Sequence, residues 1–434
     1  MPELKRKIIV YAPVIKLGLR DLMNANVLES LNREFNIHWY LQQSNDKIPF
    51  FTEENTSILY MSPTRQFLWS FLFEIENYIY NREKIGSKQS FPFLGMGRKQ
   101  IVILKLIIKF RLTRIFKGFL KCLLRLSVPS APSFFQDSEL VICFGSSKDP
   151  FFDDIVRIAR KNHIRIVMVS LNWDNATSKP YIEKPDLILS WGKQTASLSE
   201  KLHGIKSRPI GTPRYESYKS IEIFDKDLAK LKVGLESHFR YILFAGVGFP
   251  FPEIEVLNRL SEYLESTCKP DYRIIYRPHP FGWKRENANK TDSFAKYVIL
   301  DPTLELFDPE DPMQYRYLFS ACDGLVSAYS TMMVEAALHG IPMLAIAFND
   351  GTDKYFNWVN HADVAPHLQI LKENSSVIRC HELGQLKTAF SKLLEATNNL
   401  PWTEANDMAM EIVHLPQTLY ADLLNNEINT LIQN

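Results

Sequence analysis

The stretch from Asp323 to Pro342 constrains the fold more than any other part of the chain. It opens with a short apolar run and a few small residues. Residues 331–338 then have helical character, which Gly340 and Pro342 end. A second apolar run, residues 343–348, follows directly. Strand, helix and strand in this order form the unit of a parallel sheet, so we expect an α/β fold.

Three polar residues lie near the start of this helix. We expect Ser330 and Thr331 to cap it, with its first N–H groups facing a phosphate. Glu335 follows Thr331 by four residues, so the two side chains share one face of the helix. A carboxylate beside a phosphate cradle suits a nucleotide, whose ribose hydroxyls it would bind. An ordinary capped helix is the alternative, and this stretch alone favours neither.

Composition and charge exclude several classes of protein. With 434 residues, 46% hydrophobic and 23% charged, the chain is globular and long enough for about two or three domains. A net charge of +2 gives no basis for binding nucleic acid. Five scattered cysteines indicate reduced thiols, with neither disulfides nor a zinc site. We find no signal peptide and no apolar run of about 18 residues, so we expect a cytoplasmic protein without a spanning helix.

The N-terminal half has the pattern of a doubly wound α/β domain. Strands are predicted at 7–12, 35–41, 140–144, 164–170, 186–191 and 208–214. A helix is expected at 19–34, between the first two strands. The polar stretch 215–232 is the predicted linker, so we place the first domain at 1–220.

The segment 98–125 within this domain is basic and apolar. It holds nine Lys and Arg residues and no acid. Four of its cations recur at helical spacing and form one stripe: Arg114, Lys117, Lys121 and Arg125. We favour an amphipathic helix that contacts the inner face of an anionic membrane. A core helix whose lysines extend to solvent is the alternative.

A polar loop, residues 171–180, follows the predicted strand 164–170. Ligands of open α/β sheets bind outside the carboxyl ends of the strands, which makes this loop a candidate site. Asp174 is its candidate catalytic residue, and a surface loop with an Asx-turn is the alternative.

The C-terminal half repeats the α/β pattern. We place a second domain at 221–400 and a helical tail at 401–434. Gly246 and Gly248 form a glycine loop after a strand, and we interpret it as a turn that faces a phosphate. The strand at 272–276 leads into Arg277 and His279, within the sequence R-P-H-P. Arginine can bind phosphate oxygens, and histidine can donate to a leaving phosphate.

Several of these motifs together resemble the GT-B glycosyltransferases. They are N-W-D-N-A-T-S-K at 172–179, P-D-L-I-L-S-W-G at 185–192, I-G-T-P-R-Y at 210–215, R-P-H-P at 277–280 and S-T-M-M-V-E-A-A-L-H-G-I-P at 330–342. More narrowly, the chain is similar to the bacterial surface-polysaccharide branch. That branch includes capsule synthesis proteins and CDP-glycerol glycerophosphotransferases. The resemblance covers residues 140–350.

The resemblance implies two Rossmann-like domains that face each other across a cleft. A nucleotide-activated donor would bind the C-terminal domain, with no metal and no cofactor. Ser330 and Thr331 would then hold phosphate and Glu335 ribose, while Arg277 and His279 would neutralise the leaving group.

The N-terminal domain would bind the acceptor, with Asp174 as the candidate base. If the transfer retains configuration, no base is needed there, and Asp174 would position the substrate instead.

We therefore expect a glycosyltransferase of surface-polysaccharide synthesis, acting on a glycan or lipid-linked acceptor. Transfer of a polyol phosphate from a CDP-activated donor would use the same donor site. A nucleotide-sugar epimerase would also fit this fold, as would a non-catalytic nucleotide-binding scaffold on the membrane.

Overall fold

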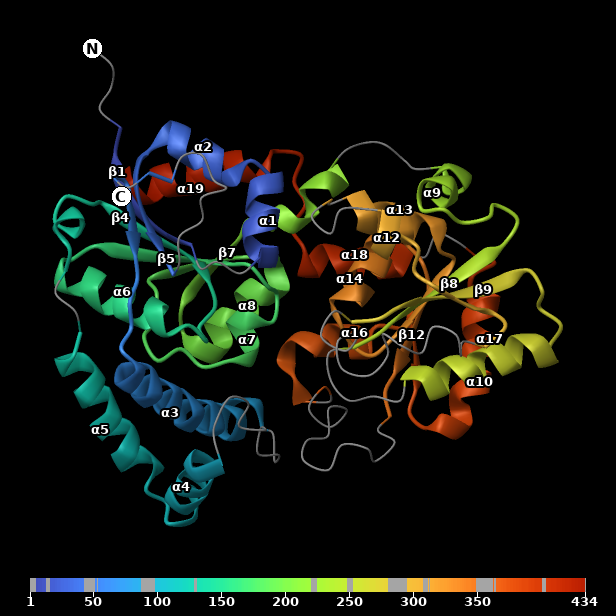
Figure 1. The fold of residues 1–434 in the computed structure, drawn as a ribbon, viewed down its shortest axis with the longest axis horizontal. Coiled ribbons are helices and arrows are strands. Elements are labelled where there is room, and N and C mark those ends of the chain that lie inside the picture. The colour runs from blue at the N-terminus through green and yellow to red at the C-terminus, as the bar shows by residue number, and fades with distance from the viewer. Residues whose placement is uncertain are drawn as a thin grey trace. The chain divides into compact units, whose positions relative to one another are not determined.

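The computed structural model describes residues 5–12, 16–42, 51–52, 54–86, 98–128, 131–219, 225–247, 253–279, 295–306, 311, 313–348, 362, 364–399 and 403–433. These residues form two compact units, each built around one parallel sheet (Figure 1). The first unit comprises Met1–Lys219 and Ile412–Asn434, and the second comprises Ser220–Glu411. The predicted α/β class with two Rossmann-like domains is confirmed, while their arrangement across a cleft stays a prediction.

The first sheet has, within the described residues, seven parallel strands in the order β3-β2-β1-β4-β5-β6-β7. They are β1 (Lys7–Ala12), β2 (Asn36–Leu41), β3 (Thr56–Ile58), β4 (Leu140–Gly145), β5 (Arg165–Ser170), β6 (Leu187–Ser190) and β7 (Lys206–Pro209). Ile9 pairs with His38 on one side and Val141 on the other, which fixes the register of the central strands. The strand order reverses between β1 and β4, and this reversal is the switch point of the sheet.

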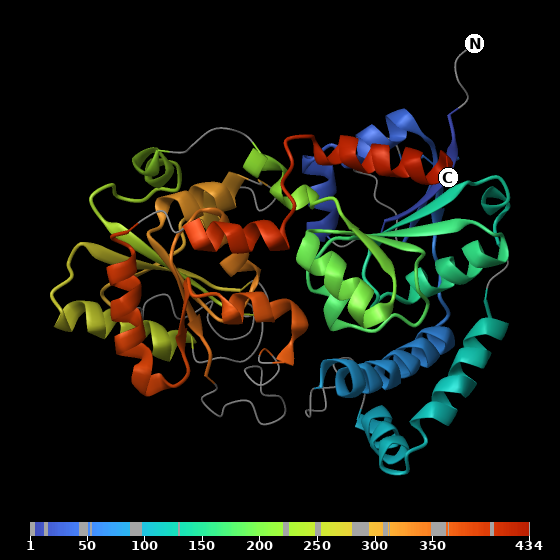
Figure 2. The ribbon, with the colours of Figure 1, turned by 180° about the vertical axis from the view of Figure 1, so that it is seen from behind.

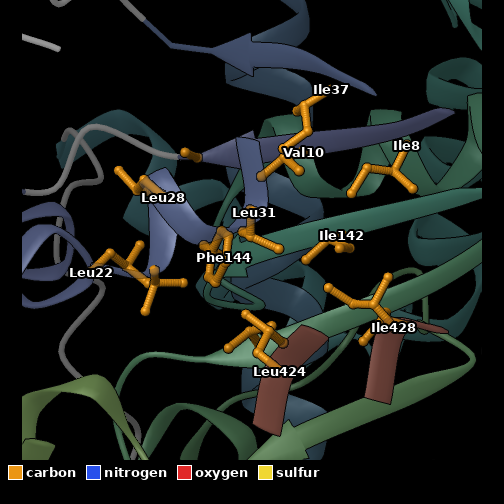
Figure 3. Close-up of a cluster of buried hydrophobic side chains, with 14 of the residues drawn as sticks. Ile8, Val10, Leu22, Leu28, Leu31, Ile37, Ile142, Phe144, Leu424 and Ile428 are labelled. Carbon is orange, nitrogen blue, oxygen red and sulfur yellow. The ribbon is translucent and has the colours of Figure 1, made fainter. Parts of the chain in front are cut away.

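Helices cover both faces of this sheet. They are α1 (Lys16–Asn24), α2 (Val27–Glu34), α6 (Pro150–Lys161), α7 (Asn175–Ser178), α8 (Lys193–His203) and α19 (Tyr420–Gln433). Along β1, Ile8 and Val10 join one buried cluster (Figure 3), whereas Ile9 and Tyr11 join the other. Because both faces are covered, the strands are apolar on both sides, as in other parallel sheets.

The C-terminal helix α19 completes the first of these clusters. Its Leu424 lies among the buried side chains drawn in Figure 3, and Asn425 Nδ2 donates to Ser30 Oγ at 2.9 Å. The preceding helix, α18 (Thr403–Ile412), lies almost entirely in the second unit. The residues that we expected to form one helical tail, 401–434, are thus divided between the two units.

Three helices form a separate group in the first unit: α3 (Pro63–Tyr80), α4 (Arg98–Lys109) and α5 (Thr113–Leu126). Figures 1 and 2 both place α3 between the sheet and α4. The guanidinium of Arg65 on α3 pairs with Asp154 of α6 and donates to the carbonyl of Leu124 on α5 at 3.0 Å. Trp69 Nε1 donates to Asp153 Oδ2 of α6 at 2.5 Å. These buried polar contacts fix α3 and α5 to α6, which covers one face of the sheet. None of the helices among the described residues is long and apolar enough to cross a membrane.

The second sheet has six parallel strands in the described part of the chain, in the order β10-β9-β8-β11-β12-β13. They are β8 (Arg240–Ala245), β9 (Tyr272–Arg277), β10 (Val298–Leu300), β11 (Gly324–Ser327), β12 (Met343–Ile346) and β13 (Val377–Cys380). The helices of this unit include α9 (Lys226–Lys232), α10 (Glu253–Ser266), α12 (Thr303–Leu306), α13 (Met313–Ala321), α14 (Thr331–Leu338), α16 (Gln369–Glu373) and α17 (Leu386–Ala396). The β11–α14–β12 succession confirms the unit that the sequence predicted at Asp323–Pro342.

Replacing Arg65 tests how firmly the helical group is fixed. We expect Arg65→Met to lower the free energy of unfolding by about 3 kcal/mol, because Asp154 stays buried with one partner fewer. Arg6 is the control, since its pair with Glu139 at 3.6 Å is half exposed. Arg6→Met should cost less than about 1 kcal/mol in the same urea titration. Equal losses in the two variants would contradict this assignment.

Candidate functional site

The carboxyl ends of three neighbouring strands meet at one edge of the second sheet. The order β9-β8-β11 brings together the loops that follow these strands. Gly246 N donates to the carbonyl of Arg277 at 2.8 Å, which joins the ends of β8 and β9. Ser327 Oγ donates to the carbonyl of Ala245 at 3.1 Å and lies 3.2 Å from Ser330 Oγ, which joins β8 to the start of α14. The structure therefore gathers Gly246, Arg277 and Ser330, three of the predicted donor-site residues, at one edge.

Gly246 lies where the chain is too close to its neighbours for a side chain. A Cβ there would come within 2.7 and 2.9 Å of the carboxylate oxygens of Glu253 and 3.0 Å from the backbone nitrogen of His279. The glycine thus lets β8 and β9 end side by side against the start of α10. Gly248, the second glycine of the predicted turn, lies outside the described residues.

Glu253 was not predicted as a site residue. Its Oε1 accepts from Val247 N at 2.7 Å, and its Oε2 accepts from Tyr276 Oη at 2.5 Å. Burial raises the pKa of this carboxyl, while the hydrogen bonds from Tyr276 and Val247 lower it. The only sequence signal was an acid in the first turn of a predicted helix, a position that the helix dipole favours for any carboxylate.

Arg277 has partners within its own unit. Its guanidinium pairs with Asp301, donates to Thr303 Oγ1 at 3.0 Å and to Gln314 Oε1 at 3.3 Å, and lies 4.6 Å from the ring centre of Tyr315. Asp301 is fully buried and balances the positive charge. These contacts indicate that Arg277 holds the end of β9 against α13, whereas its contact with a phosphate stays a prediction.

His279 lies two residues beyond β9 and is half-buried. Burial lowers its pKa, so the ring is neutral near pH 7. A neutral imidazole offers one N–H donor and carries no positive charge. His279 at this site can therefore donate a hydrogen bond, but it brings less charge than we expected from the sequence.

The start of α14 differs from the prediction in one respect. Ser330 is the residue before the helix, but its hydroxyl makes no capping hydrogen bond and instead lies beside Ser327 Oγ. Thr331, the first helical residue, is partly exposed. Ser330 thus has the N-cap position that we expected, but the expected capping hydrogen bond from its side chain is absent, and Ser327 at the end of β11 is its partner instead.

Glu335 is buried one turn further along α14, with 1% of its surface exposed. Its carbonyl accepts from His339 Nδ1 at 2.9 Å. The carboxylate stands on a helix that starts at the site edge, and its role on a ribose stays a prediction.

Asp174 belongs to the first unit, in the loop after β5. Its carbonyl accepts from Thr177 N at 3.0 Å and Ser178 N at 2.8 Å, so it starts the short helix α7. Its carboxylate is partly exposed and lies 3.5 Å from Ser178 Oγ. Asp174 is thus at the carboxyl edge of the first sheet, as the sequence predicted for a site residue.

No cluster of three or more His, Cys, Asp or Glu side chains that could hold a metal ion occurs within the described ranges. The polar groups at the edge of the second sheet include backbone amides and hydroxyls, beside the His279 ring, the Arg277–Asp301 pair and the Glu253 carboxylate. The amides and hydroxyls can donate hydrogen bonds to a ligand. Such groups bind an anionic ligand by hydrogen bonds.

Compared by sequence, the chain matches no protein family and no curated protein. By structure, it is similar to a complex of S. aureus MnaA with UDP, with a TM-score of 0.52 and 12% identity over 99% of this chain and 97% of that chain. A putative UDP-N-acetylglucosamine 2-epimerase from Listeria monocytogenes has the same TM-score, identity and coverage. The wall teichoic acid polymerase TagF is similar with a TM-score of 0.49 and 12% identity, over 99% and 90% of the two chains.

These structural similarities establish the fold of the chain. The chain has the GT-B fold, with two Rossmann-like domains, in common with the two neighbours that have a TM-score of 0.52. At these identities the likeness concerns the fold, so the activity has to be argued from the site.

Replacing Gly246 tests the close approach at the site edge. We expect Gly246→Ala to destabilise the protein by about 1–3 kcal/mol, because the new methyl group meets the Glu253 carboxylate and a backbone nitrogen. Gly118, in the middle of α5, is the control, since a Cβ there meets nothing within 4 Å. Gly118→Ala should stabilise the helix by about 0.5–1 kcal/mol. If Gly246→Ala leaves the stability measured by thermal unfolding unchanged, the edge of the second sheet is loosely packed and this assignment is wrong.

Proposed function

We propose that this chain is a glycosyltransferase that moves a sugar from a nucleotide-activated donor to a glycan or lipid-linked acceptor in surface-polysaccharide synthesis. The observation that carries the proposal is the meeting of the β8, β9 and β11 ends with the start of α14 at one edge of the second sheet. In α/β folds this edge binds nucleotides, because helix N–H groups and loop hydroxyls face the phosphates there. The motifs around Arg277 and Ser330 support the capsular branch of this class.

In the proposed reaction an acceptor oxygen attacks the sugar carbon, and the nucleotide leaves with the electron pair of the broken bond. Ser330, Thr331 and the first N–H groups of α14 would bind its phosphates as fixed dipoles. His279 would donate a hydrogen bond to the leaving phosphate. Glu335 would bind the ribose, and Asp174 is the candidate base that the sequence predicts. No metal or cofactor is required in this scheme, and the nucleotide-sugar is a substrate.

A nucleotide-sugar epimerase is the second candidate, and the two structural neighbours with a TM-score of 0.52 favour it. One is bound to UDP, and the other is described as a putative UDP-N-acetylglucosamine 2-epimerase. An epimerase would interconvert two nucleotide-sugars without an acceptor. A CDP-polyol phosphotransferase and a non-catalytic nucleotide-binding scaffold also stay open, because both would use the same donor site.

Nucleotide binding can be measured by thermal unfolding with UDP, GDP, CDP, CMP and their sugars. We expect one nucleotide to stabilise the protein by about 2.7 kcal/mol at a hundredfold excess over its Kd. His279→Ala and Glu335→Gln should reduce this stabilisation, because each removes a proposed contact. His238→Ala is the control, since that side chain is exposed elsewhere in the unit. If no nucleotide stabilises the wild-type protein, the transferase proposal is wrong.

We also propose that α4 and α5 contact the membrane, through a different face from the one that the sequence suggested. Lys117 and Lys121 both pair with Glu76 of α3 at 2.8 Å. Arg125 lies 3.8 Å from the buried Glu183. The basic stripe is thus directed in large part at acids of the first unit. It therefore helps to hold α5 in place.

The opposite face of α4 and α5 is apolar and exposed. Its exposed large side chains are Val102, Ile103, Leu106, Phe110, Leu112, Ile115, Phe119 and Leu126. No Asp or Glu occurs between Glu83 and Asp137, and Lys105 and Lys109 of α4 are exposed beside the apolar side chains. Exposed apolar side chains flanked by cations suit the headgroup region of an anionic bilayer. Contact there would bring a cytoplasmic enzyme to a lipid-linked acceptor.

Sedimentation with phosphatidylglycerol-containing vesicles tests the membrane contact. Phe110 and Phe119 are 63% and 58% exposed, so the double variant Phe110→Ser/Phe119→Ser should fold normally. We expect it to bind about thirtyfold more weakly, because it loses about 2 kcal/mol of apolar transfer. The double variant Leu228→Ser/Leu231→Ser removes exposed leucines of α9 and should bind like the wild type. Equal binding by all three proteins would contradict the assignment of this face.

A further inference from the structure

A second polar cluster lies at the switch point of the first sheet. Tyr11 is on β1, Gln42 follows β2, and Asp149 follows β4. Tyr11 Oη donates to Asp149 Oδ2 at 2.5 Å, across the boundary between β1 and β4 where the strand order reverses. Gln42 Nε2 lies 2.5 Å from Tyr11 Oη and 3.2 Å from Asp149 Oδ2. Loops after the two strands at such a boundary separate and leave a crevice, which is where open α/β sheets bind ligands.

The two oxygens of Asp149 have different partners. Oδ1 accepts from Phe151 N at 3.0 Å and caps α6, whereas Oδ2 faces Tyr11 and Gln42. An ordinary cap needs only the first of these contacts. At the start of α9, for example, Asp225 Oδ1 accepts from Asp227 N and Leu228 N, and this cap is exposed.

The cluster is buried but reaches the surface at one member. Tyr11 is fully buried and Asp149 is 6% exposed, whereas Gln42 is partly exposed. Gln42 also makes the longest of the three contacts, so a hydroxyl of a bound molecule can replace it on Oδ2. Ser147, two residues before Asp149, has a buried hydroxyl without a hydrogen-bond partner in the described structure. Buried hydroxyls are rarely left unpaired, and a bound polar molecule would satisfy this one.

The protonation of Asp149 suits proton transfer near neutral pH. Burial raises its pKa to about 6, against the hydrogen bonds from Tyr11, Phe151 and Gln42, which lower it. Tyr11 and Cys143 of β4 are the titratable groups that interact with its charge, and both have a pKa raised well above the ordinary value by burial. Both stay neutral, and Asp149 carries the proton that moves between about pH 5 and 7. A base is most effective when its pKa lies near the working pH.

We propose that Asp149 is the general base of the acceptor site, which it forms with Tyr11 and Gln42 at the switch point of the first sheet. This inference rests on the proposed transfer reaction and replaces Asp174 in it. The acceptor hydroxyl takes the place of Gln42 on Oδ2 and gives its proton to that oxygen. Its oxygen bonds to the sugar carbon while the bond from this carbon to the phosphate breaks. The nucleotide leaves with the electron pair, so charge and atoms balance. The acceptor is a hydroxyl compound, such as a sugar or polyol, and needs no acidic group of its own.

Asp149→Asn is the informative variant, because asparagine keeps the cap and the shape but cannot take a proton. We expect its melting temperature to stay within about 2 °C of the wild type. Its stabilisation by nucleotides should be unchanged, because those bind the second unit. Release of nucleotide from UDP-, GDP- and CDP-sugars, with water as acceptor, should fall about a hundredfold or more. Asp225→Asn is the matched control at an exposed cap and should release nucleotide like the wild type.

The pH dependence separates a base from a purely structural residue. The wild-type rate should rise through about pH 6, as Asp149 loses its proton. In Tyr11→Phe this rise should move to higher pH, because the lost hydrogen bond had lowered the pKa of Asp149. In Asp149→Asn the rise should be absent. If Asp174→Asn removes the rise and Asp149→Asn keeps it, Asp174 is the base and the proposal is overturned.

Protonation of Asp149 can also be followed without any reaction, in case water is too poor an acceptor for nucleotide release to be measured. Infrared difference spectra between pH 4.5 and 7.5 should show a buried carboxyl that titrates near pH 6 and is lost in Asp149→Asn. If the wild type binds a nucleotide but shows no such carboxyl, Asp149 is not the base and the transferase proposal still stands. If no nucleotide binds at all, the transferase proposal fails, and this inference fails with it.

Discussion

Parallel pairing of strands is the constraint on which both units depend. A parallel strand can join its neighbour only through a crossover, and the crossover helices bury both faces of the sheet. All strands then end at one edge, so every loop that follows a strand opens there. In the second unit this edge carries Gly246, His279 and Ser330, and in the first unit it carries Gln42, Asp149 and Asp174. The topology of the two sheets therefore gathers the candidate site residues from segments that are far apart in sequence.

The carboxyl edge of the second sheet is held together mainly by close packing and hydrogen bonds rather than by ion pairs. Gly246 permits the ends of β8 and β9 to meet, and the Glu253 carboxylate joins Val247 to Tyr276. Arg277, the one strong cation among the predicted donor-site residues, is balanced by Asp301. A nucleotide at this edge would meet amides and hydroxyls that are already in place. Such pre-set dipoles suit a leaving phosphate, because they need no rearrangement during the reaction.

The sequence predicted features that local pattern determines. The bounds of β1 and α14 agree with the predicted segments, because apolar runs and breakers define them. The proximity of Gly246, Arg277 and Ser330 could also be predicted from the sequence, because the carboxyl ends of parallel strands share one edge of the sheet. Contacts between distant side chains could not be predicted from the sequence. Tyr11 and Asp149 are separated by 138 positions, and the pair of Lys117 with Glu76 joins two helices whose packing no local pattern reveals. The hydrogen bond of the Ser330 hydroxyl was misassigned for another reason: Ser327 is only three positions away, but it ends β11 and lies beside that hydroxyl in the turn to α14.

The return of α19 to the first unit has a consequence for synthesis of the chain. The second unit, Ser220–Glu411, is inserted between two parts of the first. Leu424 and Ile428 belong to the same buried cluster as Ile8 and Val10 (Figure 3), so the first unit lacks part of its core while the ribosome makes the second. The apolar layer over β1 closes only when the last helix has been made. A nascent chain that stops before α19 would leave that layer exposed to chaperones and proteases, because Leu424 and Ile428 would be missing from the cluster.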